Sequence, residues 1–190
     1  PLRYGSLGQS RKRTNLARIY SGFCTAEDGA SVPYIVVVKI GHPWERSASA
    51  PGNRGKRDST HLVARYLHNV LTYPGLNPRT VLSPLEAAIH DALTGANVDP
   101  RRIEFLVNVD GDTSIARRAP GVLLDILNTN RDVAAASGSM TITNSFASPW
   151  APVAALRSAI DQHARPASQQ TFSRLAIINT AFAAYRVQNP

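Results

Sequence analysis

Residues 15–40 read NLARIYSGFCTAEDGASVPYIVVVKI and contain two runs of strand-forming residues separated by a turn. In the second run, the even-numbered residues of 32–40 are all apolar and share one face of a strand. Between the runs, Glu27-Asp28-Gly29-Ala30 supplies the residue types of a tight turn. The stretch therefore predicts an N-terminal β-hairpin with strands at residues 15–25 and 31–40.

Helical spacing of apolar residues follows the hairpin, and the clearest helix begins after Ser83. The sequence Ser83-Pro84-Leu85-Glu86 is a capping box with proline at the first helical position, and Gly95 suits a C-terminal cap. Further helices are predicted for residues 59–73, 121–128, 153–163 and 168–187, and short strands for residues 103–109 and 139–143. We therefore expect an α+β fold, in which the hairpin and one or two further strands pack with four or five helices.

The charge of the chain is concentrated in its first third. The 190 residues carry 21 Lys and Arg against 13 Asp and Glu, and residues 1–65 hold 11 of the basic and only 4 of the acidic groups. Of the 21 basic residues 18 are arginine, whose guanidinium binds phosphate through two parallel hydrogen bonds. A GC-rich genome would also favour arginine, but it would not move the net charge into one region.

Two basic segments flank the hairpin. Residues 1–14 contain little apolar material and are predicted to form a basic extended arm, followed by a single domain over residues 15–190. Residues 44–58 lack any apolar periodicity, so we interpret them as a long basic loop within that domain. Because the outer ends of an antiparallel hairpin meet, the arm and the loop are expected at the same end of the sheet.

These segments predict a patch that binds phosphate groups. A solvated surface with no partner is the alternative interpretation, and the sequence contains no motif for reading bases. The residues expected to contact nucleic-acid phosphates are Arg11, Lys12, Arg13, Arg18, Arg54, Lys56 and Arg57.

The composition favours a structural protein over an enzyme. One cysteine, Cys24, excludes an internal disulfide framework, and no apolar run is long enough for a membrane helix. We therefore expect a viral or phage coat subunit that binds RNA rather than DNA, assembles with copies of itself, and needs no cofactor, metal or membrane. A cellular nucleic-acid-binding module shares the same basic patch. With no signal peptide evident, the expected location is the virion or the cytoplasm.

A local motif supports a second function. His90-Asp91 lies in a predicted helix and His61 begins the preceding one, a pattern that resembles the HD-type metal-dependent phosphohydrolases. The resemblance implies that His61, His90 and Asp91 bind a divalent metal, with Asp125 or Asp132 as the last ligand, and that the metal activates water for attack on phosphorus.

A second acidic motif follows the strand predicted at residues 103–109. Asp110-Gly111-Asp112 places two carboxylates at a strand end, where they suit Mg²⁺. The motif resembles the start of haloacid-dehalogenase-type phosphotransferases, which implies a nucleophilic Asp110. An ordinary Asp-Gly turn accounts for the same residues without any chemistry.

Overall fold

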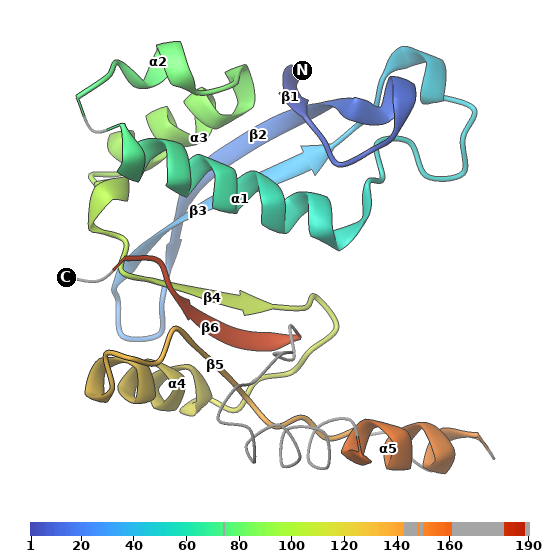
Figure 1. Ribbon diagram of the computed structural model, residues 1–190, viewed down its shortest axis with the longest axis vertical. Coiled ribbons are helices and arrows are strands. Elements are labelled where there is room, and N and C mark those ends of the chain that lie inside the picture. Colours follow the sequence, from blue (N-terminus) through green and yellow to red (C-terminus); the bar gives the residue numbers. More distant parts are fainter. Residues whose placement is uncertain (74, 143–147, 149, 161–180, 189–190) are drawn as a thin grey trace. The chain divides into compact units, whose positions relative to one another are not determined.

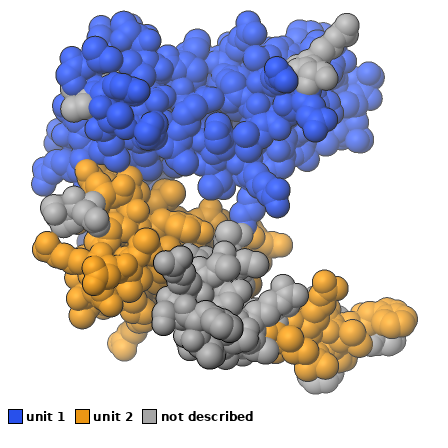
Figure 2. Space-filling model, viewed as in Figure 1, with its two compact units in different colours: residues 1–102 blue, residues 103–190 orange. Residues whose placement is uncertain are grey.

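The computed structural model describes residues 1–73, 75–142, 148, 150–160 and 181–188. The chain divides into two compact units, residues 1–102 and residues 103–190, which are coloured separately in Figure 2. Each unit contains one small antiparallel sheet with helices, so the predicted α+β class is confirmed. The expected single domain over residues 15–190 stays a prediction.

The predicted hairpin forms the larger part of the sheet in the first unit. Strands β2 (Thr14–Thr25) and β3 (Ser31–Lys39) pair antiparallel from Ala17 opposite Lys39 to Thr25 opposite Ser31. Strand β1 (Leu2–Gly5) adds to the other edge of β2, which gives the order β1-β2-β3 (Figure 1).

The first residues of the chain are part of this sheet, in contrast to the extended arm that we expected. Tyr4 pairs with Asn15 across β1 and β2, and the Tyr4 side chain is only 1% exposed. A short 3-10 helix, η1 (Ser10–Arg13), then leads into β2. The prediction missed β1 because its four residues are too few for the alternation of apolar Leu2 and Tyr4 to stand out as a strand pattern.

The helices of the first unit are η2 (Pro43–Glu45), α1 (Gly55–Thr72), α2 (Pro78–Val81), α3 (Pro84–Gly95) and η3 (Pro100–Arg102). Two of them, α1 and α3, pack against the sheet. Leu62 of α1 and Leu85 of α3 form a buried cluster with Tyr4 and Ala17 of the strands. Helix α1 begins four residues before the predicted start at 59, so residues 55–58 of the expected basic loop are its first turn.

The predicted start of α3 is confirmed in detail. The backbone N–H of Glu86 donates to the Ser83 hydroxyl over 3.5 Å, and the Glu86 carboxylate accepts from the Ser83 backbone N–H over 2.8 Å. Both halves of the capping box are therefore present.

The second unit contains strands β4 (Phe105–Val109), β5 (Ala135–Ser137) and β6 (Phe182–Arg186), with helices α4 (Ala119–Thr129) and α5 (Ala151–Ala159). Its sheet has the order β4-β6-β5, so the strand latest in the sequence lies in the middle. Leu123 and Leu127 of α4 pack with Phe182 and Ala184 of β6. Among the described helices of both units, none is long and apolar enough to cross a membrane.

Two predictions for this unit need correction. A helix was expected over residues 168–187, but Phe182–Arg186 form the strand β6. Residues 168–180 of that expected helix lie outside the described residues. Alanines at 183 and 184 favour a helix by propensity, but pairing with strands on both sides decides the conformation. The short strand expected at residues 139–143 is instead β5, and residues 139–142 are irregular. Beyond the hairpin, the described residues contain four further strands, more than predicted.

Candidate anion-binding site at the start of helix α1

The loop between β3 and α1 is closed by two glycines that touch. Gly41 and Gly52 have φ angles of 73° and 72°, in the left-handed region that favours glycine. A Cβ atom at Gly52 would lie 2.4 Å from the backbone nitrogen of Gly41. No side chain fits there, so only glycine allows the backbones at residues 41 and 52 to come this close and close the loop before α1 begins.

A buried ion pair lies inside this closed loop. The Arg54 guanidinium donates to both carboxylate oxygens of Glu45, from Nη1 to Oε2 over 2.8 Å and from Nη2 to Oε1 over 2.5 Å. Only 2% of the Arg54 side chain and 4% of the Glu45 side chain are exposed. Glu45 also accepts from the backbone N–H groups of Gly52 over 3.1 Å and His42 over 3.3 Å.

These hydrogen bonds keep Glu45 ionised. The hydrogen bonds from Arg54 lower the pKa of the Glu45 carboxyl from 4.5 to about 2, and they outweigh burial, which favours the neutral acid. The pair with Glu45 also raises the pKa of Arg54. Both groups therefore stay charged throughout the neutral range.

A second buried carboxylate fixes the first turn of α1. Asp58 accepts from the Tyr4 hydroxyl over 2.8 Å and from the Leu7 backbone N–H over 2.9 Å, and it pairs with Lys39 Nζ over 2.7 Å. Burial opposes ionisation of Asp58, but the hydrogen bonds from Lys39, Leu7 and Tyr4 together lower its pKa. Burial, followed by the hydrogen bond to Asp58, raises the pKa of Tyr4. The turn is thus tied to both β1 and β3.

Asn15 connects the two carboxylate clusters. Its amide nitrogen donates to the Gly52 carbonyl and to the Tyr4 hydroxyl, each over 2.9 Å. Lys39 Nζ, which pairs with Asp58, also donates to the Gly55 carbonyl over 3.3 Å. Residues 52–58, which we call the cationic segment, are therefore held at both ends by buried groups.

Five of the predicted phosphate-binding residues are exposed: Lys12 and Arg13 in η1, Arg18 in β2, and Lys56 and Arg57 in the first turn of α1. Arg54 is instead buried in its ion pair, and the Arg11 side chain lies outside the described residues. The backbone N–H of Ser6 donates to the Arg13 carbonyl over 2.8 Å, and Leu7 donates to Asp58. These bonds link the end of η1 to the start of α1, so the structure brings the two basic segments together as expected.

The arrangement suits an anion. Exposed Lys56 and Arg57 lie where α1 presents its first backbone N–H groups, and the helix dipole is positive at that end. Their backbone is fixed, so binding would order only their side chains. Phosphate and carboxylate are the anions that ammonium and guanidinium groups bind.

The expected metal site is not formed by the residues that the structure describes. His61 is exposed on α1, Asp91 is exposed and paired with Arg79 over 3.2 Å, and Asp125 and Asp132 belong to the second unit. Within the part of the chain that the structure describes, no group of three histidine, cysteine or carboxylate side chains could hold a metal.

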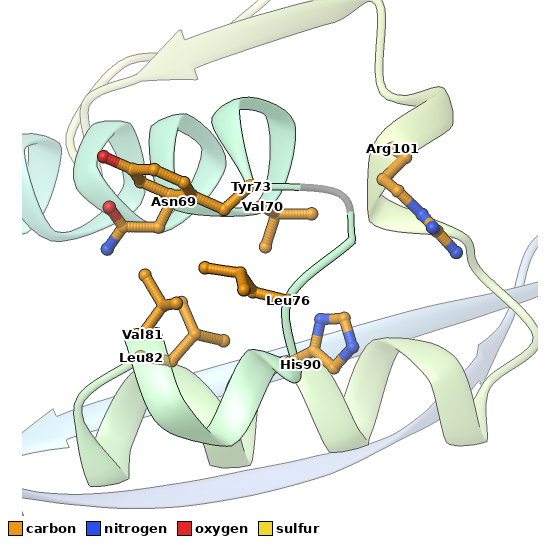
Figure 3. A pocket seen from close by; sticks show the side chains of 8 residues that line it. All are labelled: Asn69, Val70, Tyr73, Leu76, Val81, Leu82, His90 and Arg101. Carbon is orange, nitrogen blue, oxygen red and sulfur yellow. The ribbon is translucent and has the colours of Figure 1, made fainter.

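His90 belongs to an apolar pocket. Its Nδ1 lies 3.2 Å from the Tyr66 hydroxyl. The pocket has a volume of about 140 Å³, and Figure 3 shows aliphatic side chains around it, with His90 and Arg101 at one side. The lining residues are Asn69, Val70, Tyr73, Leu76, Val81, Leu82, His90 and Arg101. The described lining contains no second histidine and no cysteine or carboxylate, so this pocket offers His90 no second ligand of the usual metal-binding types.

The acidic motif after β4 forms a turn in the second unit. The Asp110 backbone N–H donates to the Ala181 carbonyl over 2.9 Å, and the Thr113 N–H donates to the Asp110 carbonyl over 3.0 Å. Asp112 is exposed. Two carboxylates at a strand end suit Mg²⁺, and this assignment stays a prediction.

Comparison with known proteins identifies the family. The sequence model of a family described as chitin synthase matches residues 1–190, which is the whole chain. The chain belongs to the chitin synthase family. It is 33% identical over 190 residues to Chitin synthase 6 of Mycosarcoma maydis, which covers 100% of this chain and 15% of the relative. No solved structure matches.

Other chitin synthases match over nearly the same length. Chitin synthase A of Aspergillus oryzae is 33% identical over 188 residues, and Chitin synthase 5 of Zymoseptoria tritici is 31% identical over 189. These matches cover 98% and 99% of this chain but 10% of each relative. The chain thus spans about a tenth to a seventh of the length of these chitin synthases.

This membership corrects the predicted functions. The coat-protein prediction, the nucleic-acid partner and the alternative phosphohydrolase are wrong, because the family is one of glycosyltransferases. The error has a physical origin in the charge count. Several cations of the first third are paired internally, Lys39 with Asp58, Arg54 with Glu45, and Arg65 with Glu86. The first two pairs lie within residues 1–65 and cancel in the net charge, so the regional excess of cations remains, but it does not by itself identify nucleic acid as the partner.

The sequence analysis also missed the buried polar groups that organise the site. Tyr4, Asn15, Glu45 and Asp58 carry no motif that identifies them. One signal was available, since the first 65 residues contain only four acidic groups, and two of these are Glu45 and Asp58. An isolated carboxylate in a basic region is a candidate for a buried ion pair.

Proposed function

We propose that this chain is part of a chitin synthase and contributes to the glycosyl transfer that extends chitin. The observation that carries the proposal is the similarity to chitin synthases along the whole chain, at 30–33% identity. The proposed activity is the one for which the relatives are named. We assign it to this chain because the family model matches all 190 residues.

The geometry suggests which part of the reaction the first unit serves. Glycosyl transfer from a nucleotide sugar breaks a bond to a diphosphate, on which negative charge develops as the sugar leaves. Fixed cations and helix N–H groups stabilise such charge. Lys56 and Arg57 at the start of α1 supply both, and we assign them to the diphosphate of a UDP-sugar donor. In this proposal Lys56 and Arg57 bind phosphate groups, as the sequence predicted, but those of a nucleotide sugar and not those of a nucleic acid.

Replacing the matching segment of Chitin synthase 6 with this chain tests the proposal. We expect the chimera to incorporate N-acetylglucosamine from its UDP derivative into a polymer that chitinase degrades. A chimera that reaches the membrane in normal amount but makes no polymer would contradict the proposed function, provided that the same exchange with the segment of Chitin synthase A retains activity.

Direct binding tests the residue assignment. Lys56→Ala/Arg57→Ala should weaken UDP binding to the chain about a hundredfold or more, because it removes two charge-assisted contacts of roughly 1.5–3 kcal/mol each. Arg101→Ala/Arg102→Ala is the matched control, because it removes two consecutive exposed cations from η3 of the same unit. Equal losses in the two variants, measured by isothermal titration calorimetry, would remove the assignment.

A further inference from the structure

We propose that the buried Glu45–Arg54 pair positions Lys56 and Arg57 for the donor diphosphate, and that Arg54 itself is not a ligand. The inference rests on the proposed function and adds a positioning residue to it. Sequence alone places Arg54 with the other cations of residues 54–57, and only the structure separates it from them.

The contacts of Arg54 leave it no hydrogen-bonding edge for a ligand. Its two terminal nitrogens both donate to Glu45, and 2% of its side chain is exposed. Its Nε is buried and lacks a hydrogen-bond partner among the described groups. A residue that binds an outside anion would turn one of these nitrogens to the surface. In Arg54, both terminal nitrogens instead face Glu45 inside the closed loop, and Nε is buried.

The pair lies next to the backbone that carries the exposed cations. Arg54 is the residue before α1, and its partner Glu45 also accepts the Gly52 backbone N–H. Gly52 and Gly55 both have positive φ, a combination that would leave the chain many conformations without an anchor. At the other end of the cationic segment, Asp58 is fixed by Lys39 and Tyr4. Lys56 and Arg57 therefore extend from a short stretch anchored on both sides.

The energetics favour a positioning role over a stabilising one. A buried ion pair adds little net stability, because desolvation of both charges offsets their attraction. The unsatisfied Arg54 Nε adds a further cost. Such a pair is useful where it holds a defined geometry, since groups fixed before binding lose less entropy when the ligand arrives.

A double variant separates position from charge. Glu45→Gln/Arg54→Met removes the pair, keeps the approximate size of both side chains, and leaves the net charge unchanged. We expect it to fold, because no charge is left buried alone, and to bind UDP about tenfold more weakly. Hydrogen exchange should accelerate at the amides of residues 52–57. Arg54→Lys, which keeps the charge but loses the two-pronged contact, should fall between the wild type and the double variant.

A matched pair elsewhere in the unit gives the control. Arg65 of α1 and Glu86 of α3 form a second ion pair with a buried carboxylate, at 2.7 Å. Arg65→Met/Glu86→Gln should leave UDP affinity within twofold of the wild type. If a folded Glu45→Gln/Arg54→Met protein binds UDP as tightly as the wild type, the inference is wrong.

Combining the variants distinguishes a positioning residue from a ligand. In the Lys56→Ala/Arg57→Ala background there is nothing left to position, so the Glu45→Gln/Arg54→Met change should cost less than twofold more. A further tenfold loss there would make Arg54 a direct ligand and overturn the inference. A wild-type chain that does not bind UDP at all would contradict the proposed function instead.

Discussion

The two units of this chain use different interactions in their interiors. The buried side chains of the first unit include Asn15, Glu45, Asp58 and Glu86, whereas the buried side chains described in the second unit are all apolar. Buried charges need partners with defined geometry, and apolar groups need only matching volume. The first unit is therefore built to hold particular atoms in place, and the second to pack a sheet against a helix.

The largest effect should follow from removing the Asp58 carboxylate. Asp58→Ala removes the carboxylate that pairs with Lys39 and accepts from the Tyr4 hydroxyl, and it should lower the free energy of unfolding of the first unit by about 3–5 kcal/mol. Hydrogen exchange with mass spectrometry would report the loss in peptides of residues 1–102. Asp112→Ala, at an exposed carboxylate of the second unit, should change stability by less than about 0.5 kcal/mol.

In the second unit, the comparable loss should come from a cavity. Leu127 is fully buried between α4 and β6, so Leu127→Ala should cost about 2–5 kcal/mol. The loss should appear in peptides of residues 103–142 and should be the same at pH 7 and pH 4. A strong pH dependence of this cost would show that the contrast between the units is wrong.

Acid should destabilise the first unit selectively. The folded pKa of Glu45 is about 2, below its ordinary 4.5, so its contribution to stability is present above the ordinary value and is lost as the pH falls toward 2. Its loss amounts to about 3 kcal/mol between pH 6 and pH 2, and Asp58 acts in the same direction. Urea unfolding of a Trp150→Phe variant, followed by Trp44 fluorescence, would measure it. Glu45→Gln should flatten the profile.

The smallest expected effect concerns a helix cap. Ser83→Ala removes the acceptor for the Glu86 backbone N–H at the start of α3 and should cost about 1 kcal/mol. Ser83→Asp should restore most of the loss, because aspartate is also a good N-cap residue. An alanine variant as stable as the wild type would mean that the Glu86 carboxylate alone maintains this start.

Sequence reasoning succeeded where the decisive interactions are local. The β2–β3 hairpin and the start of α3 depend on alternation, turn residues and a capping box within a few positions. It failed at β6, whose partners β4 and β5 lie about 45–80 residues earlier in the sequence. For the candidate site it found the exposed Lys56 and Arg57, but it could not separate Arg54 from them. That distinction depends on Glu45, nine residues away across a closed loop.

The central place of β6 also affects how the chain is made. Among the described strands, β4 and β5 pair only with β6. During synthesis both strands leave the ribosome before β6 exists, so each carries unpaired N–H and C=O groups until residue 186 is available. The first unit needs no later segment to complete its sheet, since β1, β2 and β3 all lie within residues 2–39. The sheet of the first unit can therefore form before that of the second. Until β6 is synthesised, the unpaired edges of β4 and β5 are the part of the chain that a chaperone would bind.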